Sequence, residues 1–214
     1  MATPIVGTNV KVEIESTLGS ALPVTGLTKA NPGVATSAAH GLANGDVVVF
    51  SVSGGMVELD GQAVRVANVT ANTFELEGLD TTDYSTWTSG DAYKVTAFHT
   101  MDSAQQFTMP NPAPAKLDTT TLLDKTKQST YGLPESPDGQ ITGLFNPTGA
   151  AEAEIRVATK ANTARVFRIT WSSGLKAIFN ANVSGGSGFD MQTNAVATAT
   201  TSFTPKKDVL YYSS

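Results

Sequence analysis

Cysteine is absent from this chain of 214 residues, and its absence excludes several kinds of site together. Without thiol groups the chain can form no disulfide bond, no thiolate zinc site and no cysteine nucleophile. Apolar runs are also short: the longest, residues 47–50, has the length of a buried strand rather than of a membrane-spanning helix. Residues 1–4 lack the basic start and apolar core of a secretory signal. We therefore expect a protein that is soluble and intracellular when it is synthesised.

Basic charge is scarce as well. The chain holds 14 lysines and arginines against 19 aspartates and glutamates, for a net charge of −5. All of this excess lies in residues 24–97, which carry three basic and eight acidic residues, whereas the remainder is balanced. Binding to nucleic-acid phosphates needs a patch of basic side chains. The close basic pairs here, Lys125 with Lys127 and Lys206 with Lys207, are interpreted as solvated surface charges, so the pattern disfavours specific nucleic-acid binding.

Catalytic and metal-binding patterns are missing too. The two histidines, His40 and His99, are far apart in the sequence and have no cysteine to help them hold a metal. The aspartates of residues 24–97 lack the spacing of a calcium loop and are typical of turns. Residues 172–174 and 184–188 are rich in serine and glycine, but they match neither a nucleophile elbow nor a phosphate-binding loop. We predict no enzyme activity, no metal site and no cofactor.

Glycine, threonine, serine, alanine and valine are abundant, which is typical of all-β proteins with many turns. Residues 165–171 and 175–183 both alternate between two faces, and the Ser172-Ser173-Gly174 turn between them predicts an antiparallel hairpin. Residues 195–203 alternate small apolar residues with threonine and serine, which suits a strand that contacts another subunit or a smooth surface. Residues 9–15 predict a further strand with one face in water.

Residues 24–97 differ in character from the segments that flank them. They contain the turns Asn31-Pro32-Gly33 and Asn44-Gly45, and we predict short strands at 46–52, 63–69, 73–76 and 92–98. The sequence therefore predicts two domains: residues 1–23 together with 98–214, and a small all-β insert at 24–97. Within the insert, Tyr84 and Trp87 either stack on a sugar or form a local hydrophobic cluster that holds the small domain together.

The segment after the insert predicts a strand at 105–109, followed by a proline-rich stretch, 110–114, that cannot occupy a central strand. Residues 116–128 are polar and rich in threonine, and we expect an extended arm there. A turn at 132–139 then leads to a strand at 140–145.

One segment predicts a helix. Asn146 is suited to cap it and Pro147 to occupy its first position, where a missing N–H costs nothing. Glu152 and Glu154 near the start and Lys160 near the end suit the helix dipole, and the apolar residues between them form a broad arc. The predicted fold class is mainly β: a β-sandwich or partial barrel with one flanking α-helix, plus the small all-β insert.

Several short segments outside the insert follow one another in a distinctive order: Gly7–Ile14, Thr130–Pro134, Gly139–Phe145, the Asn146-Pro147 helix start, Val166–Ile169, Gly174–Lys176 with Phe179–Ala181, and Thr201–Lys207. As an ordered set they resemble the major tail tube protein of bacteriophages with long, non-contractile tails, the siphovirus type. The insert departs from a simple tube protein. It looks like a small β module of several phage tail and baseplate-type proteins, through Thr28–Val34, Gly41–Asp46 and Val69–Phe74.

The resemblance implies a structural protein of the virion. Copies would form hexameric rings in which the inner sheets join into one β-barrel around a channel, and the rings would stack into a tube through which DNA passes into the host. Its partners would be other copies of itself, a tape measure protein inside, and terminator and distal tail proteins at the ends. Genomic DNA would pass without specific binding, and no membrane would be involved. The protein would occupy the phage tail, and the host cytoplasm before assembly.

Under this resemblance, particular residues acquire expected roles. A DNA conduit should be lined by neutral, polar side chains, for which the candidates are Gln140, Thr142, Thr198, Thr200 and Ser202. The polar arm should bridge to the adjoining ring, through Lys116, Asp118, Thr119, Asp124, Lys125, Lys127 and Tyr131. The acidic insert should decorate the outside of the tube, because a domain of that size would block a channel.

Two other interpretations stay open. One is a tail-completion or secretion-tube protein that shares the same fold and forms rings without long tubes. The other is a carbohydrate-binding β module, in which Tyr84 and Trp87 of the insert would be exposed and contact a glycan.

Overall fold

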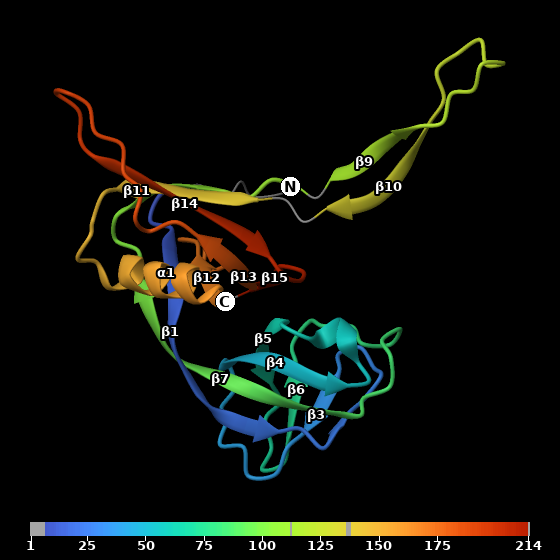
Figure 1. Ribbon diagram of the computed structural model, residues 1–214. Helices are drawn as coiled ribbons and strands as arrows, with labels where there is room; N and C mark the ends of the chain where they lie inside the picture. Colours follow the sequence, from blue (N-terminus) through green and yellow to red (C-terminus); the bar gives the residue numbers. More distant parts are fainter. Residues whose placement is uncertain (1–6, 112, 136–137, 214) are drawn as a thin grey trace.

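The computed structural model describes residues 7–111, 113–135 and 138–213. The N-terminal residues 1–4 discussed above, Pro112 of the proline-rich stretch and residues 136–137 of the expected turn lie outside the described residues. The fold is mainly β, with one α-helix in the described part of the chain, and its antiparallel sheet curls into a half-barrel (Figure 1). The predicted fold class is confirmed, in its partial-barrel form.

Three parts can be distinguished. The body contains the strands of the half-barrel and the helix: β1 (Lys11–Pro23), β7 (Ser89–Thr100), β8 (Ala104–Thr108), β11 (Gly139–Leu144), α1 (Ala150–Ala161), β12 (Ala164–Thr170), β13 (Lys176–Ser184), β14 (Thr198–Pro205) and β15 (Leu210–Tyr212). The insert, residues 24–97, contains β2 (Gly26–Leu27), β3 (Val34–Thr36), β4 (Val47–Gly54), a 3₁₀ turn (Val57–Leu59), β5 (Ala63–Ala67) and β6 (Thr73–Leu76). The arm consists of β9 (Ala113–Asp118) and β10 (Ser129–Glu135).

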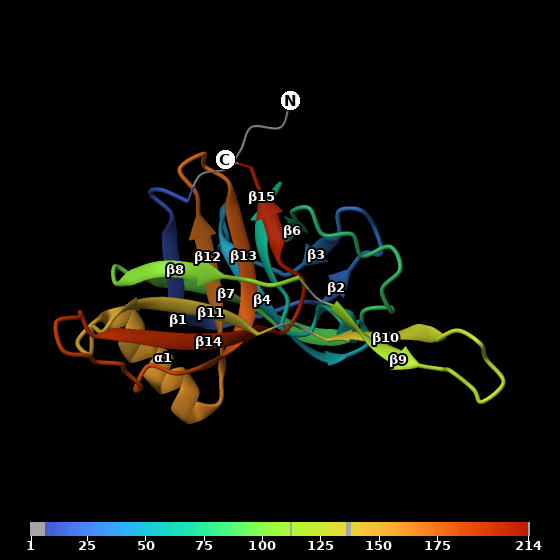
Figure 2. The same cartoon turned by 90° about the horizontal axis from the view of Figure 1, so that it is seen from above.

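One continuous sheet runs through the body and the insert. Its strand order is β2-β3-β6-β5-β4-β7-β1-β12-β13-β14-β11-β8, with β15 paired to β13 and the arm strands paired only to each other. In Figure 2 the strands β8, β11 and β14 run across β12 and β13, which shows how strongly the sheet curls. The predicted hairpin of residues 165–183 is present as β12 and β13, in register from Ala164 with Asn182 to Thr170 with Lys176.

Strands β1 and β7 join the two larger parts. They pair antiparallel from Glu13 with Thr100 to Pro23 with Asp91, and the register shifts at several points along the way. The first strand is therefore longer than the predicted 9–15, because β1 continues to Pro23 against β7. Strand β7 also crosses the predicted boundary at residue 97, so the insert is tied to the body by a two-stranded ribbon.

The core of the body lies inside the half-barrel. Alternation along β12, β13 and β14 places Phe167, Phe179 and Phe203 on the same side, where their ring centroids are 5.4 to 5.6 Å apart. Phe107 of β8 stacks on Phe203 at 5.2 Å. Helix α1 closes this core with its buried face, formed by Ala151, Ile155 and Ala158.

The helix begins later than predicted. Its first residue is Ala150 and its N-cap is Gly149, whose extended backbone has ψ of 139°. The first α-helical bond runs from the N–H of Ala153 to the carbonyl of Gly149, so Asn146 and Pro147 lie in a preceding turn and do not cap the helix. The carbonyl of Pro147 accepts a hydrogen bond from Arg156, 2.9 Å away, which secures that turn against the helix instead.

The strand of residues 9–15 was expected to leave one face in water, and this is wrong. Glu13 and Glu15 are both buried, because β7 and β12 flank β1 and donors on β12 bind both carboxylates. Glu13 pairs with Arg168 at 2.6 Å and with Lys11 at 2.7 Å. Burial would raise the pKa of Glu13, but its hydrogen bonds and ion pairs with Arg168 and Lys11 outweigh burial and lower it. Burial raises the pKa of Glu15, although its carboxylate accepts a hydrogen bond from the N–H of Val166 at 3.1 Å.

The insert has a core of its own. Phe50, Met56, Leu59 and Phe74 are almost completely buried there, together with the indole of Trp87. A tight turn at Gly55, with φ of 88°, lets the chain pass the backbone of Thr86 and Thr88 where a side chain would collide. The insert therefore folds round its own hydrophobic cluster while sharing strands with the body.

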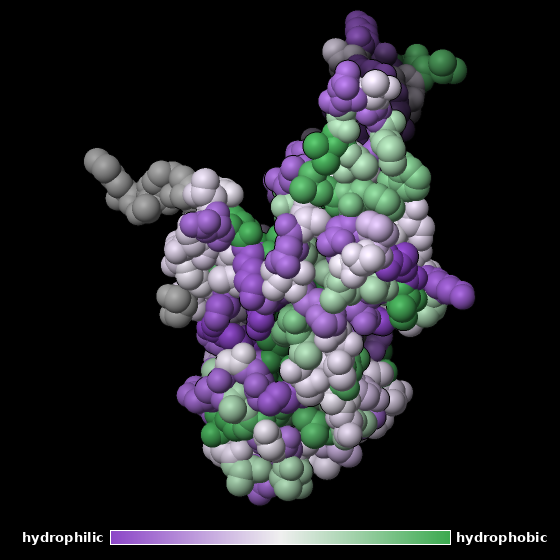
Figure 3. Space-filling view, turned by 90° about the vertical axis from the view of Figure 1, so that its left-hand side faces the viewer, coloured by the Kyte–Doolittle hydropathy of each residue, from purple (hydrophilic) through white to green (hydrophobic). Residues whose placement is uncertain are grey.

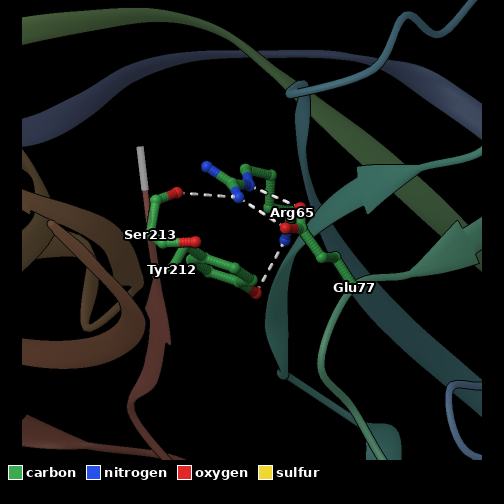
Figure 4. Close-up of polar contacts among 4 residues, drawn as sticks. All are labelled: Arg65, Glu77, Tyr212 and Ser213. Atoms are coloured by element: carbon green, nitrogen blue, oxygen red, sulfur yellow. Dashed lines mark hydrogen bonds and ion pairs between the residues drawn. The ribbon is translucent and has the colours of Figure 1, made fainter. Parts of the chain in front are cut away.

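The insert also meets the C-terminal strand of the body. Arg65 of β5 forms a two-pronged ion pair with Glu77 at 2.5 Å, and its guanidinium donates to the carbonyl of Ser213 at 3.2 Å (Figure 4). The N–H of Arg65 donates to the phenol oxygen of Tyr212 at 2.9 Å. A small apolar cluster that includes Val47, Ala63, Val166 and Ile178 lies beneath these contacts. Burial raises the pKa of Tyr212 to about 12.

Candidate assembly surfaces

An uncharged polar face covers the outside of the half-barrel. In the β11–β14 pair, Gln140 lies opposite Ser202, Thr142 opposite Thr200, and Leu144 opposite Thr198. These positions alternate with the buried Gly139, Ile141, Gly143, Thr201 and Phe203, so their side chains point away from the phenylalanine core. The five residues that the sequence predicted for a channel lining thus share one face of the sheet.

Neighbouring strands extend this polar face. Gln106 and Thr108 of β8 lie opposite Thr142 and Gln140, while Ser184 and Asn182 of β13 lie opposite Ser202 and Thr204. All of these side chains are neutral. Asp138 lies at the end nearest the arm, where it accepts a hydrogen bond from the hydroxyl of Thr204.

Strand β8 ends the sheet. Within the described residues it pairs with β11 alone, so its outer edge presents N–H and C=O groups that no strand satisfies. An exposed edge of this kind is a template for a strand of another molecule. Beside it the half-barrel is open: a cavity of about 520 Å³ lies between β8 and the strands β1 and β12. Its apolar lining includes Val10, Val12, Phe107, Ile169 and Trp171.

The arm is a hairpin that projects away from the body (Figures 1 and 2). Its strands pair from Glu135 with Ala113 to Ser129 with Asp118, and residues 119–128 form its tip. The expectation of a turn at 132–135 is wrong, because these residues belong to β10. Proline is tolerated there because each strand of a two-stranded ribbon has a free edge. The seven residues predicted for the arm all lie on this hairpin and are exposed, namely Lys116, Asp118, Thr119, Asp124, Lys125, Lys127 and Tyr131.

Local hydrogen bonds hold the tip in shape. The carboxylate of Asp124 accepts from the N–H and the hydroxyl of Thr121, and that of Asp118 accepts from the N–H of Thr120 and pairs with Lys127. Hydrogen bonds from Thr121 lower the pKa of Asp124, and those from Thr120 lower the pKa of Asp118. The arm is therefore a defined ribbon although little of it packs against the body.

Sequence reasoning missed the apolar residues of this tip. Leu122 and Leu123 are exposed by 94% or more, and Leu117, Tyr131 and Leu133 are also exposed along the ribbon. Burying a leucine side chain contributes about 1.5 to 3 kcal/mol, so the exposed pair makes the tip a candidate contact surface. The available signal was two adjacent leucines inside an otherwise polar stretch.

The two aromatic residues named for a possible glycan contact, Tyr84 and Trp87, pack against the core of the insert. Trp87 is only 8% exposed, its ring packs on Phe50 at 6.4 Å, and its N–H donates to the carbonyl of Val24 at 3.1 Å. Tyr84 is partly buried against the same core, and burial raises the pKa of its phenol. The alternative prediction, a local hydrophobic cluster, describes both residues.

The two histidines, which were the remaining candidates for a metal site, lie in different parts of the fold. His40 is buried in the insert, with its ring 5.2 Å from that of Phe74, whereas His99 lies on β7 opposite Ile14. Among the residues that the structure describes, no three histidine or acidic side chains gather in a way that could hold a metal ion. No helix in this part of the chain is long and apolar enough to cross a membrane.

Comparison with known families gives a match within the insert. Residues 30–95 match the family described as the ubiquitin-activating enzyme E1 FCCH domain. This range is less than a third of the chain and, apart from the first part of β7, leaves out the half-barrel and the arm, so the likeness concerns a small β module. No curated protein matches the chain.

Proposed function

We propose that this chain is a structural subunit of a bacteriophage tail tube, in which copies join side by side into hexameric rings and the rings stack around a channel for DNA. The observation that carries the proposal is the uncharged polar face of β8, β11 and β14, which ends at the unpaired edge of β8. Pairing of that edge with a neighbouring copy would extend the polar face from subunit to subunit. A ring of such faces would form a closed barrel without free edges.

The chemistry of the face suits the passage of DNA. Proteins that grip DNA use lysine and arginine against its phosphates, and their affinity grows with the number of such contacts. Threonine, serine and glutamine offer neutral dipoles, which neither bind a moving polyanion tightly nor repel it strongly. The side chains of Gln140, Thr142 and Thr200 therefore suit a conduit better than a binding site.

The position of the insert agrees with this arrangement. In Figure 1 the strands β11 and β14 lie along the top of the molecule and the insert lies at the bottom. If the polar face lines the channel, the insert lies on the outside of the tube and does not obstruct it. Its net charge of −5 would then face solvent, where it favours solubility of the assembled particle.

The test of the polar face uses the absence of cysteine from the chain. A Thr200→Cys variant carries one thiol on the face, and a matched Asp83→Cys variant carries one on the exposed surface of the insert. We expect a bulky polymer-linked maleimide to label both variants readily as monomers. In assembled tubes it should label Asp83→Cys at the same rate but Thr200→Cys far more slowly. Equal labelling of the two variants in tubes would place the polar face outside the channel.

The arm is proposed to contact the adjoining ring. Its tip can be removed cleanly, because Asp118 and Ser129 are register partners and can be joined by an Asn-Gly turn after deletion of Thr119–Gln128. We expect the shortened protein to fold and to melt like the wild type, since the tip buries little, but to form rings that do not stack. Electron microscopy gives the readout, and tubes of normal length would refute the role of the arm.

One alternative shares these surfaces. A tail-completion or secretion-tube protein of the same fold would form closed rings that do not stack into tubes. Particles of the wild-type protein that remain single rings at high concentration would favour that function over the tube.

A further inference from the structure

A second exposed apolar surface lies on the loop between β13 and β14. Residues 185–197 protrude from the body, and a bridge between Asp190 and Thr198 closes the base of the loop, with N–H to carbonyl distances of 2.8 and 3.0 Å. Phe189, Met191 and Val196 are each more than half exposed, and the ring of Phe189 packs on Phe145 at 4.8 Å. We call these four residues the loop patch. Figure 3 views the molecule from this side and shows green, apolar atoms gathered in its upper right part.

The loop patch and the arm lie at opposite ends of the same strand. Strand β11 starts at Gly139, shortly after the arm ends. Beyond its other end, the N–H of Phe145 donates to the carbonyl of Ala197 in the loop at 2.9 Å. In Figure 1 the loop projects to the upper left and the arm to the upper right. One copy therefore cannot bring its own arm tip onto its own loop patch.

We propose that the leucine pair at the arm tip, Leu122 and Leu123, packs on the loop patch of a second copy of this chain. The proposal rests on the contact between arm and neighbouring copy described above, and it names the surface that receives the arm. A contact between unlike ends of identical molecules is heterologous and repeats without closing on itself. It is the type of contact that stacking of one ring on the next requires.

The two surfaces match in chemistry. Both are apolar side chains held on protruding loops with few neighbours to cover them. Charged residues lie beside both surfaces. At the arm tip the leucines are followed by Asp124, whose carboxylate accepts hydrogen bonds from Thr121, and then by Lys125. In the loop, Asp190 lies between Phe189 and Met191. Lys125 and Asp190 are exposed, so these opposite charges can face each other at the rim of a small apolar contact. Such a contact is weak for a single pair, but repetition round a ring makes the second and later contacts intramolecular and strengthens the whole.

The other apolar hollow, the cavity lined by Val10, Phe107 and Trp171, is a poorer receptor for the arm. It borders the free edge of β8, which the ring contact with a lateral neighbour would occupy. The loop patch lies clear of that edge, beyond the far end of β11, where the loop bridges to Thr198 of β14. It remains accessible after the proposed rings close.

Complementation between two variants tests the proposal. The arm variant is Leu122→Asp with Leu123→Asp, and the patch variant is Met191→Asp with Val196→Asp; all four side chains are exposed, so the melting temperatures should stay near that of the wild type. We expect each variant alone to form rings that do not stack. Mixed together they should form pairs of rings, because rings with intact patches receive rings with intact arms once and then have no further partner. Sedimentation velocity distinguishes single rings, pairs and tubes.

Disulfide trapping gives a second readout that does not depend on tubes. Leu123→Cys protein mixed with Met191→Cys protein should form a disulfide-linked heterodimer on mild oxidation. Leu123→Cys mixed with Val157→Cys, an exposed position on α1, is the control and should not. Normal tubes from the patch variant, or equal trapping at Met191 and Val157, would overturn the loop patch as the receptor. If the wild type forms no tubes but the Leu123–Met191 disulfide still forms, the tube function fails and the contact stands.

Discussion

The insert and the rest of the chain are both built from antiparallel strands, yet they differ in how completely they cover their own apolar side chains. Of the large hydrophobic residues exposed in the described structure, Val57 is the single one that lies in the insert. The other twelve lie on the body and the arm. The charge is distributed the opposite way, since the whole net charge of −5 belongs to residues 24–97.

This difference separates two kinds of surface. A charged surface with few apolar side chains faces water, whereas exposed apolar residues beside an unpaired strand edge indicate contact with another molecule. The insert buries most of its own apolar side chains, whereas we propose that neighbouring copies cover those that the body and the arm leave exposed. Three predictions test this contrast.

The largest effect is expected from the two cores. Phe203 and Phe74 are both almost completely buried, the first in the body and the second in the insert. Replacing either with alanine should cost about 3 to 5 kcal/mol of folding free energy. We expect Phe203→Ala to abolish rings, and Phe74→Ala to expose the insert to proteolysis while rings still form. Loss of rings in Phe74→Ala would show that the insert and the body do not fold separately, contrary to the contrast drawn above.

A second prediction removes the insert. Cutting at residue 97 would destroy most of β7, so the deletion should run from Val24 to Gly90 and join the register partners Pro23 and Asp91 through a two-residue turn. We expect rings and tubes of smaller diameter, because the proposed arrangement puts the removed domain on the outside. The newly exposed Val166 and Ile178 will lower the melting temperature. Tubes of unchanged outer diameter would contradict an external insert.

The smallest effect is expected where the insert meets the body, at the hydrogen bond between Arg65 and Tyr212. Tyr212→Phe removes the phenol oxygen that accepts from the N–H of Arg65, which should cost about 1 to 3 kcal/mol because that N–H loses its partner. In the wild type the folded-state pKa of Tyr212 is raised by burial from about 10 to about 12, so the fold favours the neutral phenol. Its contribution is fully present below pH 10 and is lost as the pH rises toward 12.

The variant should therefore lose less stability than the wild type between pH 10 and pH 12. Denaturant unfolding at both pH values measures this difference. Equal losses in the two proteins would mean that the phenol is not buried where the insert meets the body.

Local pattern was enough to predict much of the fold and of the polar face. The alternation of residues 165–183 predicted β12 and β13, and the alternation at 140–145 and 195–203 placed Gln140, Thr142, Thr200 and their neighbours on one side of the sheet. Side chains alternate between the two faces of any strand. The alternation can therefore be recognised in the sequence without knowing which strands lie beside it.

Other features depend on contacts between distant residues. Glu13 and Glu15 alternate like a solvent-facing row, and they are buried because Arg168 and Val166, far along the chain, satisfy them. Strand β1 extends past Gly19 because β7 pairs with it. The sequence left Trp87 with two possible roles, and its burial depends on packing against Phe50 and on the carbonyl of Val24, both far from it in the sequence. The loop patch was missed because its residues belong to a loop and show no period.

Electron microscopy of negatively stained wild-type protein, with sedimentation velocity of the same sample, shows whether copies of this chain form stacked rings. We expect rings with a central channel that stack into tubes, with the inserts as projections on the outer surface. A protein that stays a 22.3 kDa monomer at every concentration, with the edge of β8 protected from hydrogen exchange, would contradict it.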